Sequence, residues 1–456
     1  MTMPASIFRA YDIRGIVGET LTESTVYDIG RAFGTVVRER NESTVVVARD
    51  GRLSGPTLLK ALSDGLRATG CEVINVGCVP TPVLYYASQA FNKCAGIMLT
   101  GSHNPGNYNG LKMVLGGVAL TEAAIQDLYQ RVLKGKFAHG QGGYHTQDIT
   151  GDYLHDFLKA IKLTRPMKVV LDAGNGVAGE IAPMLFHALG CEVIPLFCEI
   201  DGHFPNHHPD PSDPHNLQDL KKAVALHQAD VGLAFDGDAD RLGVVTSQGE
   251  IIAADRLLMV YADALLKVHP KAKIIYDVKC TNHLKPVVEA LGGEPIMWKT
   301  GHSHIKAKMA AENALLGGEM SGHFFFKDRW NGFDDGLYAG ARVLEILATA
   351  AHPEAPFANI PNSVNTPEMK IEVDESEKFP LMQRLLDQAV FSEGELITLD
   401  GLRVNFADGW GLLRPSNTSP YLIMRFEAQN HAGLSRIQAA FRTWILSVEP
   451  ALALPF

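Results

Sequence analysis

The stretch TVVVARDGR (residues 44–52) decides the fold, because related stretches recur twice further along the chain. Its run of β-branched residues predicts a buried strand that breaks at Asp50 and Gly51. A helical pattern follows over residues 55–68, and the stretch CEVINVG (residues 71–77) predicts a second strand. Strand, helix and strand in this order form a β-α-β unit, in which the two strands lie in parallel.

Two further copies of this unit follow at a spacing of roughly 100 residues, which indicates whole domains rather than solenoid repeats. The second copy runs from KVVLDAGNG (168–176) through a helix to ALGCEVIPLFC (188–198). The third runs from KIIYDVKC (273–280) through a helix to ALGGEPIMW (290–298). Corresponding helix exits carry the glycines Gly70, Gly190 and Gly292. Chance similarity of short turns is the alternative, and we predict three related α/β domains.

The remainder of the chain predicts a smaller fourth domain. Residues 361–366 contain proline and asparagine and indicate a linker. Beyond them we expect a strand (368–373), a helix (378–390), paired strands around Asp400-Gly401 and a terminal helix from Leu434. The prediction is therefore three related mixed α/β-sheet domains around a central cleft plus a smaller C-terminal α+β domain, with bounds 1–149, 150–250, 251–361 and 362–456.

Composition excludes several classes of protein. The chain has 456 residues, 46% hydrophobic and 20% charged, which is typical of a soluble globular protein with several cores. It has no run of about 18 apolar residues and no signal-peptide pattern, so we expect a cytoplasmic protein without a membrane partner. A net charge of -10 argues against nucleic acid as a partner, although a cleft can still gather cations for a small anion. The six cysteines form no CxxC pair, which predicts reduced thiols.

A serine stands in an open loop after the second apolar run of the first domain. The loop TGSHNPGNYNGLK (100–112) follows residues 95–99, which predict a buried strand. Gly101 and Gly106 let the backbone approach a ligand, and free N–H groups in a tight turn favour an anion. We therefore interpret Ser102 as the carrier of a phosphoryl group.

Alternating carboxylates occupy the corresponding loop of the second domain, VGLAFDGDADRLGVV (231–245). They can converge on one hard cation through oxygen ligands, and they leave positions open for a phosphoryl oxygen, which suits Mg²⁺. An EF-hand is excluded, because its sixth and twelfth positions would be Arg241 and Ser247. A solvated acidic turn is the other alternative, but buried flanking strands disfavour it. The three predicted ligands are Asp236, Asp238 and Asp240.

Besides the serine loop and the carboxylate loop, two further polar loops lie in the third and fourth domains. The third domain contributes ALLGGEMSGH (314–323), and the fourth contributes GWGLLRPSNTSP (409–420). The latter combines a guanidinium, hydroxyls and an amide, which are groups that hold a phosphate, although such residues also populate ordinary turns. Because ligands of α/β sheets bind at the carboxyl ends of the strands, we expect the serine, the metal ligands and the recognition loop in one cleft.

Three other patterns have plainer interpretations. The histidines of HFPNHHPDP (203–211) lack regular ligand spacing and indicate a structural loop. GNGVAG (174–179), with Glu199 downstream, fits a dinucleotide fingerprint, but a tight strand-to-helix turn is the simpler use. Ser102 and His103 are not expected to form a hydrolase dyad, because sequence neighbours usually point apart and no GxSxG is present. The sequence contains no GxxxxGK[ST] motif, so ATP binding is not implied.

Five motifs in order carry a resemblance that covers essentially the whole chain. They are FRAYDIRG (8–15), TGSHNP (100–105), DGDADR (236–241), GGEMSGH (317–323) and RPSNTSP (414–420). Together they resemble the α-D-phosphohexomutase superfamily, and specifically its bacterial phosphomannomutase/phosphoglucomutase group.

This resemblance implies a role for each matching residue. Ser102 would be the phosphorylated serine and would hold one Mg²⁺ together with Asp236, Asp238 and Asp240. Arg241 would lie beside the phosphoryl group, with His103 and Lys112 as proton-transfer partners. The implied substrate-binding residues are Tyr11, Arg14, Lys279, Gly301, His302, Glu319, Met320, Ser321, Gly322, His323, Arg414, Ser416, Asn417 and Thr418.

The implied activity interconverts hexose 1-phosphate and hexose 6-phosphate, with mannose, glucose or both as the sugar. A phosphoserine would donate its phosphoryl group, and a hexose 1,6-bisphosphate would turn over in the cleft before returning the other phosphate. The resemblance further implies phosphosugars as the only small-molecule partners, the bisphosphate as activator, and a monomer or weak homodimer. A metal-dependent sugar phosphatase, a phosphoglucosamine mutase and a non-catalytic sugar-phosphate-binding protein remain alternatives.

Overall fold

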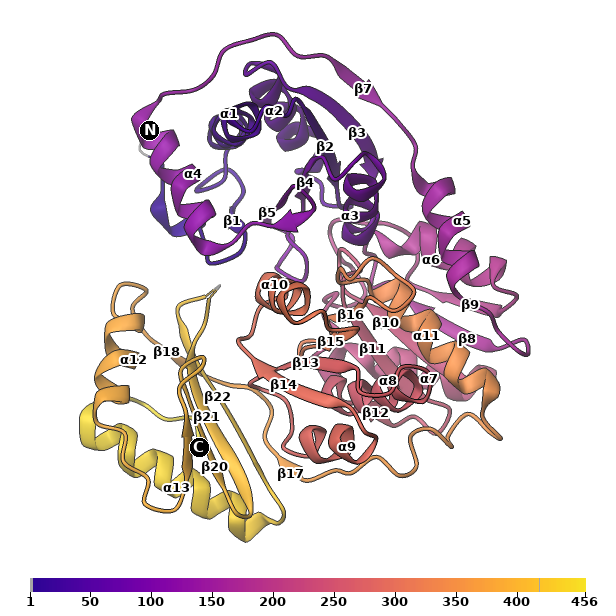
Figure 1. Cartoon of the computed structure of the whole chain (residues 1–456), viewed down its shortest axis with the longest axis vertical. Coiled ribbons are helices and arrows are strands. Elements are labelled where there is room, and N and C mark those ends of the chain that lie inside the picture. Colours follow the sequence, from indigo (N-terminus) through magenta and orange to yellow (C-terminus); the bar gives the residue numbers. More distant parts are fainter. Residues whose placement is uncertain (1–2, 418) are drawn as a thin grey trace.

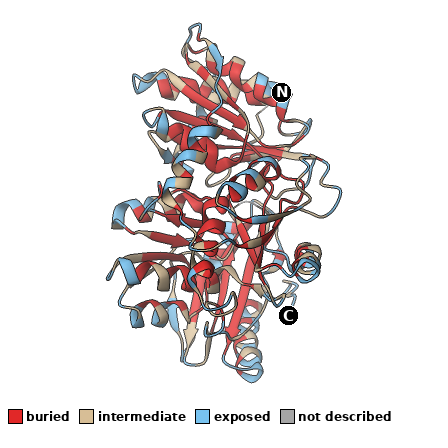
Figure 2. Ribbon diagram, turned by 90° about the vertical axis from the view of Figure 1, so that its right-hand side faces the viewer, coloured by how far each residue is buried: buried red, intermediate tan, exposed pale blue. Residues whose placement is uncertain are grey.

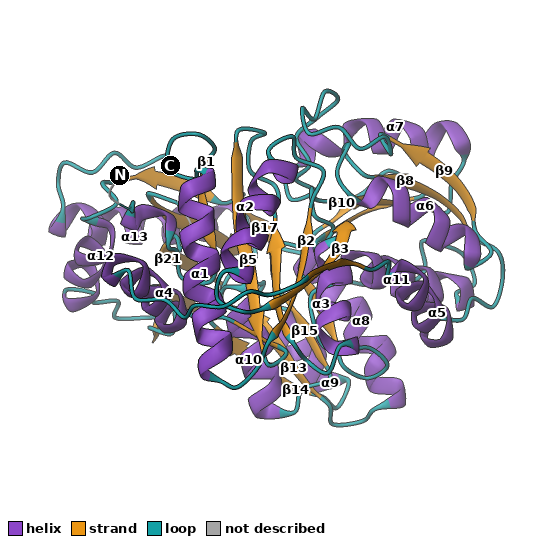
Figure 3. Cartoon of the chain, turned by 90° about the horizontal axis from the view of Figure 1, so that it is seen from above, coloured by secondary structure: helices purple, strands orange, loops and turns teal. Residues whose placement is uncertain are grey.

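The computed structural model describes residues 3–417 and 419–456, which form four sheets flanked by helices (Figure 1). Seen from above in Figure 3, helices lie outside the strands of the first three sheets. Figure 2 shows that the sheets are mostly buried and that exposed residues gather on the outer helices and loops. No helix within the described ranges is long and apolar enough to cross a membrane.

The first domain contains a seven-stranded sheet of order β1-β5-β4-β2-β3-β7, with β6 beside β5. Its strands are β1 (Ile13–Ile16), β2 (Thr44–Arg49), β3 (Glu72–Cys78), β4 (Ala95–Leu99), β5 (Tyr108–Leu115), β6 (Val118–Ala119) and β7 (Tyr144–Thr146). Its helices are α1 (Glu23–Glu39), α2 (Gly55–Arg67), α3 (Thr81–Ala90) and α4 (Glu122–Lys134), after a 3-10 turn over Ala5–Ile7.

The second and third domains contain five and four strands. The second has α5 (Thr150–Ala160), β8 (Lys168–Asp172), α6 (Ala178–Ala188), β9 (Glu192–Leu196), a 3-10 turn (Pro214–Leu217), α7 (Gln218–His227), β10 (Val231–Phe235), β11 (Leu242–Thr246) and β12 (Ile251–Ile252). The third has α8 (Ala254–Val268), β13 (Lys273–Asp277), α9 (Leu284–Ala290), β14 (Glu294–Trp298), α10 (His302–Glu312), β15 (Leu316–Gly318), β16 (Phe324–Phe326) and α11 (Gly336–Thr349).

The three sheets share one strand order. It reads β5-β4-β2-β3 in the first, β11-β10-β8-β9 in the second and β16-β15-β13-β14 in the third. In each, three strands pair in parallel, and the remaining one is antiparallel. The predicted fold class is thereby confirmed, and the three helix-exit glycines have φ between 82° and 88°. The loops that contain Ser102, the three aspartates and Glu319 each join the third parallel strand of their sheet to its antiparallel partner.

The fourth domain is an antiparallel sheet backed by two helices. It contains β17 (Val364–Asn365), β18 (Met369–Glu372), α12 (Lys378–Asp387), β19 (Glu395–Ile397), β20 (Leu402–Phe406), β21 (Gly409–Pro415), β22 (Tyr421–Ala428) and α13 (His431–Val448). The predicted linker therefore includes a short strand, because β17 pairs with β22. The terminal helix starts three residues earlier than its apolar pattern indicates, because the Asn430 side chain caps it by accepting from Gly433 N.

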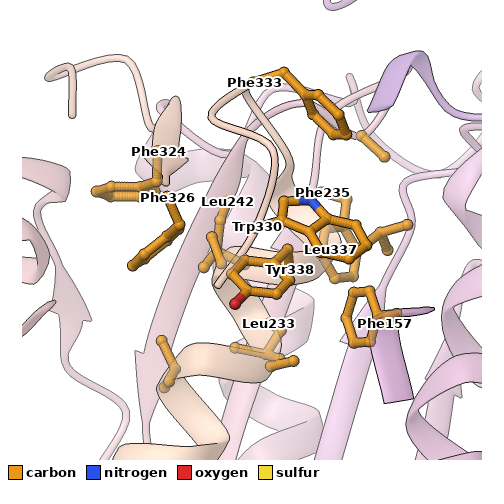
Figure 4. Close-up of a cluster of buried hydrophobic side chains, with 14 of the residues drawn as sticks. Phe157, Leu233, Phe235, Leu242, Phe324, Phe326, Trp330, Phe333, Leu337 and Tyr338 are labelled. Atoms are coloured by element: carbon orange, nitrogen blue, oxygen red, sulfur yellow. The ribbon is translucent and has the colours of Figure 1, made fainter. Parts of the chain in front are cut away.

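One apolar core joins the first three domains, and the fourth has its own core and a small buried cluster, Trp410 and Leu412 with Val278, that it shares with the third. Tyr86 of the first domain, Phe157 of the second and Trp330 of the third meet with ring centroids 5.8–6.2 Å apart. Figure 4 shows Phe157, Trp330 and Tyr338 packed with side chains of β10, β11 and β16. The boundaries at residues 149, 250 and 361 stay predictions, and all six cysteines are free, as expected.

Candidate active site

Ser102 lies against the carboxylate loop of the second domain. Its Oγ donates to Oδ2 of Asp236 at 2.8 Å, although the two residues are 134 positions apart. The backbone of Ser102 has φ 48°, a left-handed conformation that costs a non-glycine residue about 1 kcal/mol. Such strain persists only where surrounding contacts impose it. The serine is 1% exposed, so these contacts hold it in a dry site.

His103 contacts the serine beside it, contrary to the expectation that the two side chains point apart. Its Nδ1 lies 3.1 Å from Ser102 Oγ. The expectation assumed an extended chain, in which neighbours alternate, whereas the left-handed Ser102 brings both side chains to one side. Burial, followed by the nearby Arg241 and Arg14 cations, holds the pKa of His103 well below its usual value. The imidazole is therefore neutral, and the low pKa makes it a weak base.

The three aspartates of the second loop are fully buried and converge as predicted. One oxygen from each lies within 4.8 Å of the others, which is close enough to hold one metal ion. Asp238 Oδ1 and Asp240 Oδ1 have no hydrogen-bond partner among the described residues. Burial and the two neighbouring carboxylates raise the pKa of Asp236 far above its usual value. Orphaned buried carboxylate oxygens fit a hard divalent cation.

Lys112 from β5 reaches this cluster across the domain boundary. Its Nζ lies 2.7 Å from Asp238 Oδ2 and also donates to Asp240 Oδ2. Burial alone lowers the pKa of an ammonium, but Asp238 and Asp240 outweigh it and raise the pKa of Lys112. The side chain is therefore a fixed cation in this arrangement rather than a free amine.

His323 connects the recognition loop to the carboxylate loop. Its Nε2 lies 3.3 Å from Asp240 Oδ1, and its Nδ1 lies 3.3 Å from Glu319 Oε2 and 2.8 Å from Ser321 Oγ. Burial lowers the pKa of His323, but Asp240 raises it to a net value of about 9. Arg241 lies alongside, with its Nε 3.8 Å from Asp236 Oδ2. These contacts place the predicted sugar-recognition residues directly beside the predicted metal ligands.

The loop from Gly301 completes this side of the site. Gly301 N donates to Glu319 Oε1 at 2.6 Å. A Cβ at Gly301 would lie 3.0 Å from the Tyr11 ring, and its φ of 129° also favours glycine. The His302 ring, 5% exposed, has no hydrogen-bond partner on either nitrogen within the described chain, and its centroid lies 5.2 Å from that of Tyr11. Both ring nitrogens of His302 are therefore available to a ligand.

Three further predicted residues, Arg14, Met320 and Gly322, lie in the first and third domains. Arg14 donates to Asp12 Oδ2 at 2.6 Å and contacts Asn104 of the serine loop. Met320 N donates to Asp277 Oδ1 at 3.3 Å, and Gly322, with φ 91°, makes the turn to His323. These contacts orient the loops rather than present a charge.

The third and fourth domains each bring a cation to the same region. Arg414 is 4% exposed, donates from Nε to Asp400 Oδ2 at 3.0 Å and leaves Nη2 without a partner among the described residues. Lys279 Nζ donates to Glu368 Oε1 at 2.6 Å. Burial raises the pKa of the Tyr11 phenol to about 12, and Arg414 acts on it in the opposite direction. The phenol is therefore un-ionised.

The Arg414 loop is only partly described. Ser416 Oγ lies 2.8 Å from Ser419 Oγ, and Ser416 N donates to Tyr421 O at 2.9 Å. Asn417 is half-buried in the turn that follows. Thr418, also predicted as a phosphate contact, lies outside the described residues.

Sequence reasoning missed several residues that contact the site. Thr81 of α3 donates from Oγ1 to Asp238 Oδ2 at 2.5 Å, and Glu368 and Asp400 pair with the two cations of the phosphate region. Asp50 and Arg52 hold the serine loop. A signal for this last pair is present, because an aspartate stands at the end of the first strand of each repeat or directly after it (Asp50, Asp172 and Asp277), and all three are at most 1% exposed.

The competing motifs are used for structure. A Cβ at Gly176 would lie 2.9 Å from Gly237 Cα, so GNGVAG packs its backbone against the carboxylate loop. His207 Nε2 lies 3.1 Å from both carboxylate oxygens of Asp172, and burial opposes the effect of Asp172, which raises the pKa of His207. His203 contacts Asp201 at 2.8 Å. Because these histidines pair with aspartates, they support the interpretation of residues 203–211 as a structural loop.

A buried serine faces three carboxylates that could hold a metal ion, and cationic side chains lie close to it. Four family models match the chain in succession, described as phosphoglucomutase/phosphomannomutase α/β/α domain I (residues 5–139), domain II (151–249), domain III (253–361) and C-terminal domain (368–443). The chain therefore belongs to the phosphoglucomutase/phosphomannomutase family.

Its relatives resemble it from end to end. It is 54% identical to the phosphomannomutase/phosphoglucomutase of Pseudomonas aeruginosa, over 100% of this chain and 98% of that protein. It is 52% identical to a phosphoglucomutase of Neisseria meningitidis, with 98% of each chain covered. A crystal structure of a phosphoglucomutase/phosphomannomutase family protein from Burkholderia thailandensis covers 100% of both chains, with a TM-score of 0.94 and 52% identity.

Proposed function

We propose that this protein is a phosphohexomutase that interconverts the 1-phosphate and 6-phosphate of mannose, glucose or both. The observation that carries the proposal is the 2.8 Å contact between Ser102 Oγ and Asp236 Oδ2, inside a cluster of three buried carboxylates. A nucleophilic oxygen at a metal-ligand cluster is the arrangement that phosphoryl transfer through an enzyme serine needs. Full-length relatives named for both sugars support the same activity.

Asp236, Asp238 and Asp240, with the phosphorylated Ser102, would hold Mg²⁺. When bound, this ion would neutralise charge on the transferring phosphoryl oxygens. Lys112 already occupies the space between two of these carboxylates and balances their charge. Arg241, beside Asp236, is placed to hold the phosphoryl group in line with the attacking hydroxyl.

The chemistry has two halves. In the first, the bond between phosphorus and Ser102 Oγ breaks, a new bond forms to a free hydroxyl of the hexose phosphate, and the proton of that hydroxyl passes to Ser102 Oγ. In the second, Ser102 Oγ attacks the other phosphate of the bisphosphate, the bond between that phosphorus and the sugar oxygen breaks, and the serine proton passes to the sugar oxygen. The neutral His103, whose Nδ1 lies 3.1 Å from Ser102 Oγ, would relay the proton at the serine end. Lys112, which stays protonated, is the weaker candidate for this role.

The bisphosphate must present each phosphate in turn. Glu319 and Ser321, which both contact the His323 ring, would form the recognition pair, and vicinal hydroxyls could bind such a pair in either orientation. Lys279, Arg414, Ser416 and Asn417, with Thr418 beyond the described residues, would hold the phosphate that is not being transferred. The fourth domain has its own core but also packs Trp410 and Leu412 against Val278 of the third, so a shift of this domain while the sugar turns would have to keep that contact.

Ser102→Ala tests the proposal. The variant should keep the melting temperature of the wild type and lose nearly all conversion of glucose 1-phosphate and mannose 1-phosphate, each assayed with Mg²⁺ and a trace of hexose 1,6-bisphosphate. Isotopically labelled phosphate should stay in the pool of enzyme and sugar. Continuous release of inorganic phosphate by the wild type would instead identify a phosphatase. Near-normal turnover in the variant would contradict the phosphoserine mechanism.

The same assays address the remaining alternatives. Glucosamine 1-phosphate, offered at the same concentration, should be converted far more slowly than the two hexose phosphates if the enzyme serves mannose and glucose. The expected monomer or weak homodimer is tested by sedimentation over a range of protein concentrations. Both remain predictions.

A further inference from the structure

Arg52, just after β2, has no place in the proposed chemistry, yet its guanidinium is wrapped by the serine loop. The residue is 1% exposed. Nη2 donates to Ser102 O at 2.8 Å and to Asn104 O at 2.6 Å. Nη1 donates to Pro105 O at 2.6 Å and to Tyr108 O at 2.9 Å. One side chain thus satisfies four main-chain carbonyls of the loop that carries the serine.

Asp50 orients this guanidinium and holds the start of the same loop. Its Oδ2 lies 3.2 Å from Arg52 Nε, and its Oδ1 accepts from Arg52 N at 3.0 Å. Oδ2 also accepts from Thr100 Oγ1 at 2.8 Å and from Gly101 N at 3.1 Å. Thr100 Oγ1 in turn accepts from Ser102 N at 2.8 Å. The carboxylate and the guanidinium together therefore contact both sides of Ser102.

The fit of the guanidinium depends on its shape. A Cβ at Gly101 would lie 2.4 Å from Arg52 Cζ, so glycine is required where the planar group lies against the loop. From the second domain, the ring of Phe204 lies 5.3 Å from the same guanidinium. A lysine carries the same charge but has its donors on one atom, so it cannot reach four carbonyls in a fixed plane.

We propose that Arg52, oriented by Asp50, is the positioning residue that holds Ser102 in its left-handed conformation and aims Oγ at Asp236. The inference rests on the proposed mutase function. Because Ser102 must receive and donate the phosphoryl group in one place, a loose loop slows both halves of the reaction. Binding of the phosphate that is not being transferred should change little, because Lys279 and Arg414 lie on the third and fourth domains and pair there with Glu368 and Asp400.

The test is a split between kcat and KM in Arg52→Lys. A displacement of about 1 Å at a reacting group costs about 100-fold in rate. We expect kcat for glucose 1-phosphate to fall by about that factor, KM to stay within about two-fold, and phosphorylation of Ser102 by hexose 1,6-bisphosphate, followed by intact mass, to slow in parallel. The matched control is Arg49→Lys, because the Arg49 guanidinium donates to Asp50 O at 2.9 Å and, within the described chain, to no carbonyl of the serine loop, so both constants should stay unchanged.

A second variant guards against a folding failure. Gly101→Ala keeps Arg52 but pushes its guanidinium away from the loop, and it should show the same fall in kcat with an unchanged KM. A normal kcat in a folded Arg52→Lys enzyme would overturn the inference. A rise in KM as large as the fall in kcat would overturn it too. If Arg52→Lys does not fold, Gly101→Ala decides by the same criteria. A wild type that converts no hexose phosphate would instead overturn the proposed function, so the two failures are distinguishable.

Discussion

Lys279 and Glu368 form an ion pair that joins the third domain to the start of the fourth. The Nζ of Lys279 lies 2.6 Å from Oε1 of Glu368, and it lies 4.0 Å from Asp277 Oδ2. Lys279 is one of the cations that the proposed function assigns to the substrate phosphate. A carboxylate therefore occupies a position that a phosphate oxygen would take. Arg414 repeats the arrangement with Asp400 at 3.0 Å.

Glu368→Gln should lower the KM for glucose 1-phosphate, because removal of the competing charge leaves Lys279 free for the phosphate. A change of about 1 kcal/mol, typical of a partly exposed pair, corresponds to a KM about five-fold lower. Steady-state kinetics checks this. Glu372→Gln, on the exposed side of β18, is the matched control and should have no effect. An increase in KM would show that the pair closes the fourth domain productively.

The same pair predicts a pH dependence of stability. Burial raises the pKa of Glu368, but Lys279 outweighs it and lowers the value from 4.5 to about 2. A depressed pKa stabilises the fold above pH 4.5 and loses that contribution as the pH falls towards 2. The wild type should exceed Glu368→Gln in stability by about 1 kcal/mol at neutral pH. Urea unfolding at a series of pH values checks this, and a difference that persists at the acid end would contradict it.

Arg414→Ala should weaken substrate binding more than it slows the chemistry. The Nη2 of Arg414, which has no partner among the described residues, is available to a phosphate in the ground state and the transition state alike. We expect KM to rise about ten-fold or more with a small change in kcat, since a charged hydrogen bond contributes about 1.5–3 kcal/mol. Arg436→Ala on α13, where the arginine pairs with Asp408, serves as control. A large fall in kcat at constant KM would exclude the phosphate-binding role.

Thr81→Val should reduce the affinity for Mg²⁺. Thr81 comes from the first domain, is fully buried and orients Asp238 by donating to its Oδ2 at 2.5 Å. Loss of a hydrogen bond to a metal ligand typically costs about 10-fold or more in affinity. The measurement is the Mg²⁺ concentration for half-maximal activity. Thr35→Val removes a hydroxyl from α1, remote from the carboxylates, and should leave that concentration unchanged.

Local patterns predicted most of the scaffold. The strands at residues 44–49 and 168–172 follow directly from β-branched runs, and the expected helix over 55–68 is observed as Gly55–Arg67. Errors lie at element ends. The helix predicted to Val390 ends at Asp387, and Val390 is 84% exposed, so no burial favours another turn. Caps and exposure, rather than periodicity, decide where a helix stops.

The meeting of the three loops that contain Ser102, Asp236 and Glu319 was predictable for a related reason. Ser102, Asp236 and Glu319 each follow the third parallel strand of a repeat, so the expectation that they meet required only the strand order. Their detailed contacts were not predictable. The contact between Ser102 and His103 depends on a left-handed residue, which no local pattern indicated for a serine.

The sequence alone determined the order of strands and helices and which residue types stand in each loop, because these properties depend on a few neighbouring positions. Only the tertiary structure decided which charges pair. Lys112 meets Asp238 across 126 positions, and Arg52 meets Ser102 across 50. Such pairs form when whole domains pack and exclude water. A buried carboxylate then needs a cation, and a buried guanidinium needs a carboxylate or a carbonyl, wherever the fold brings one.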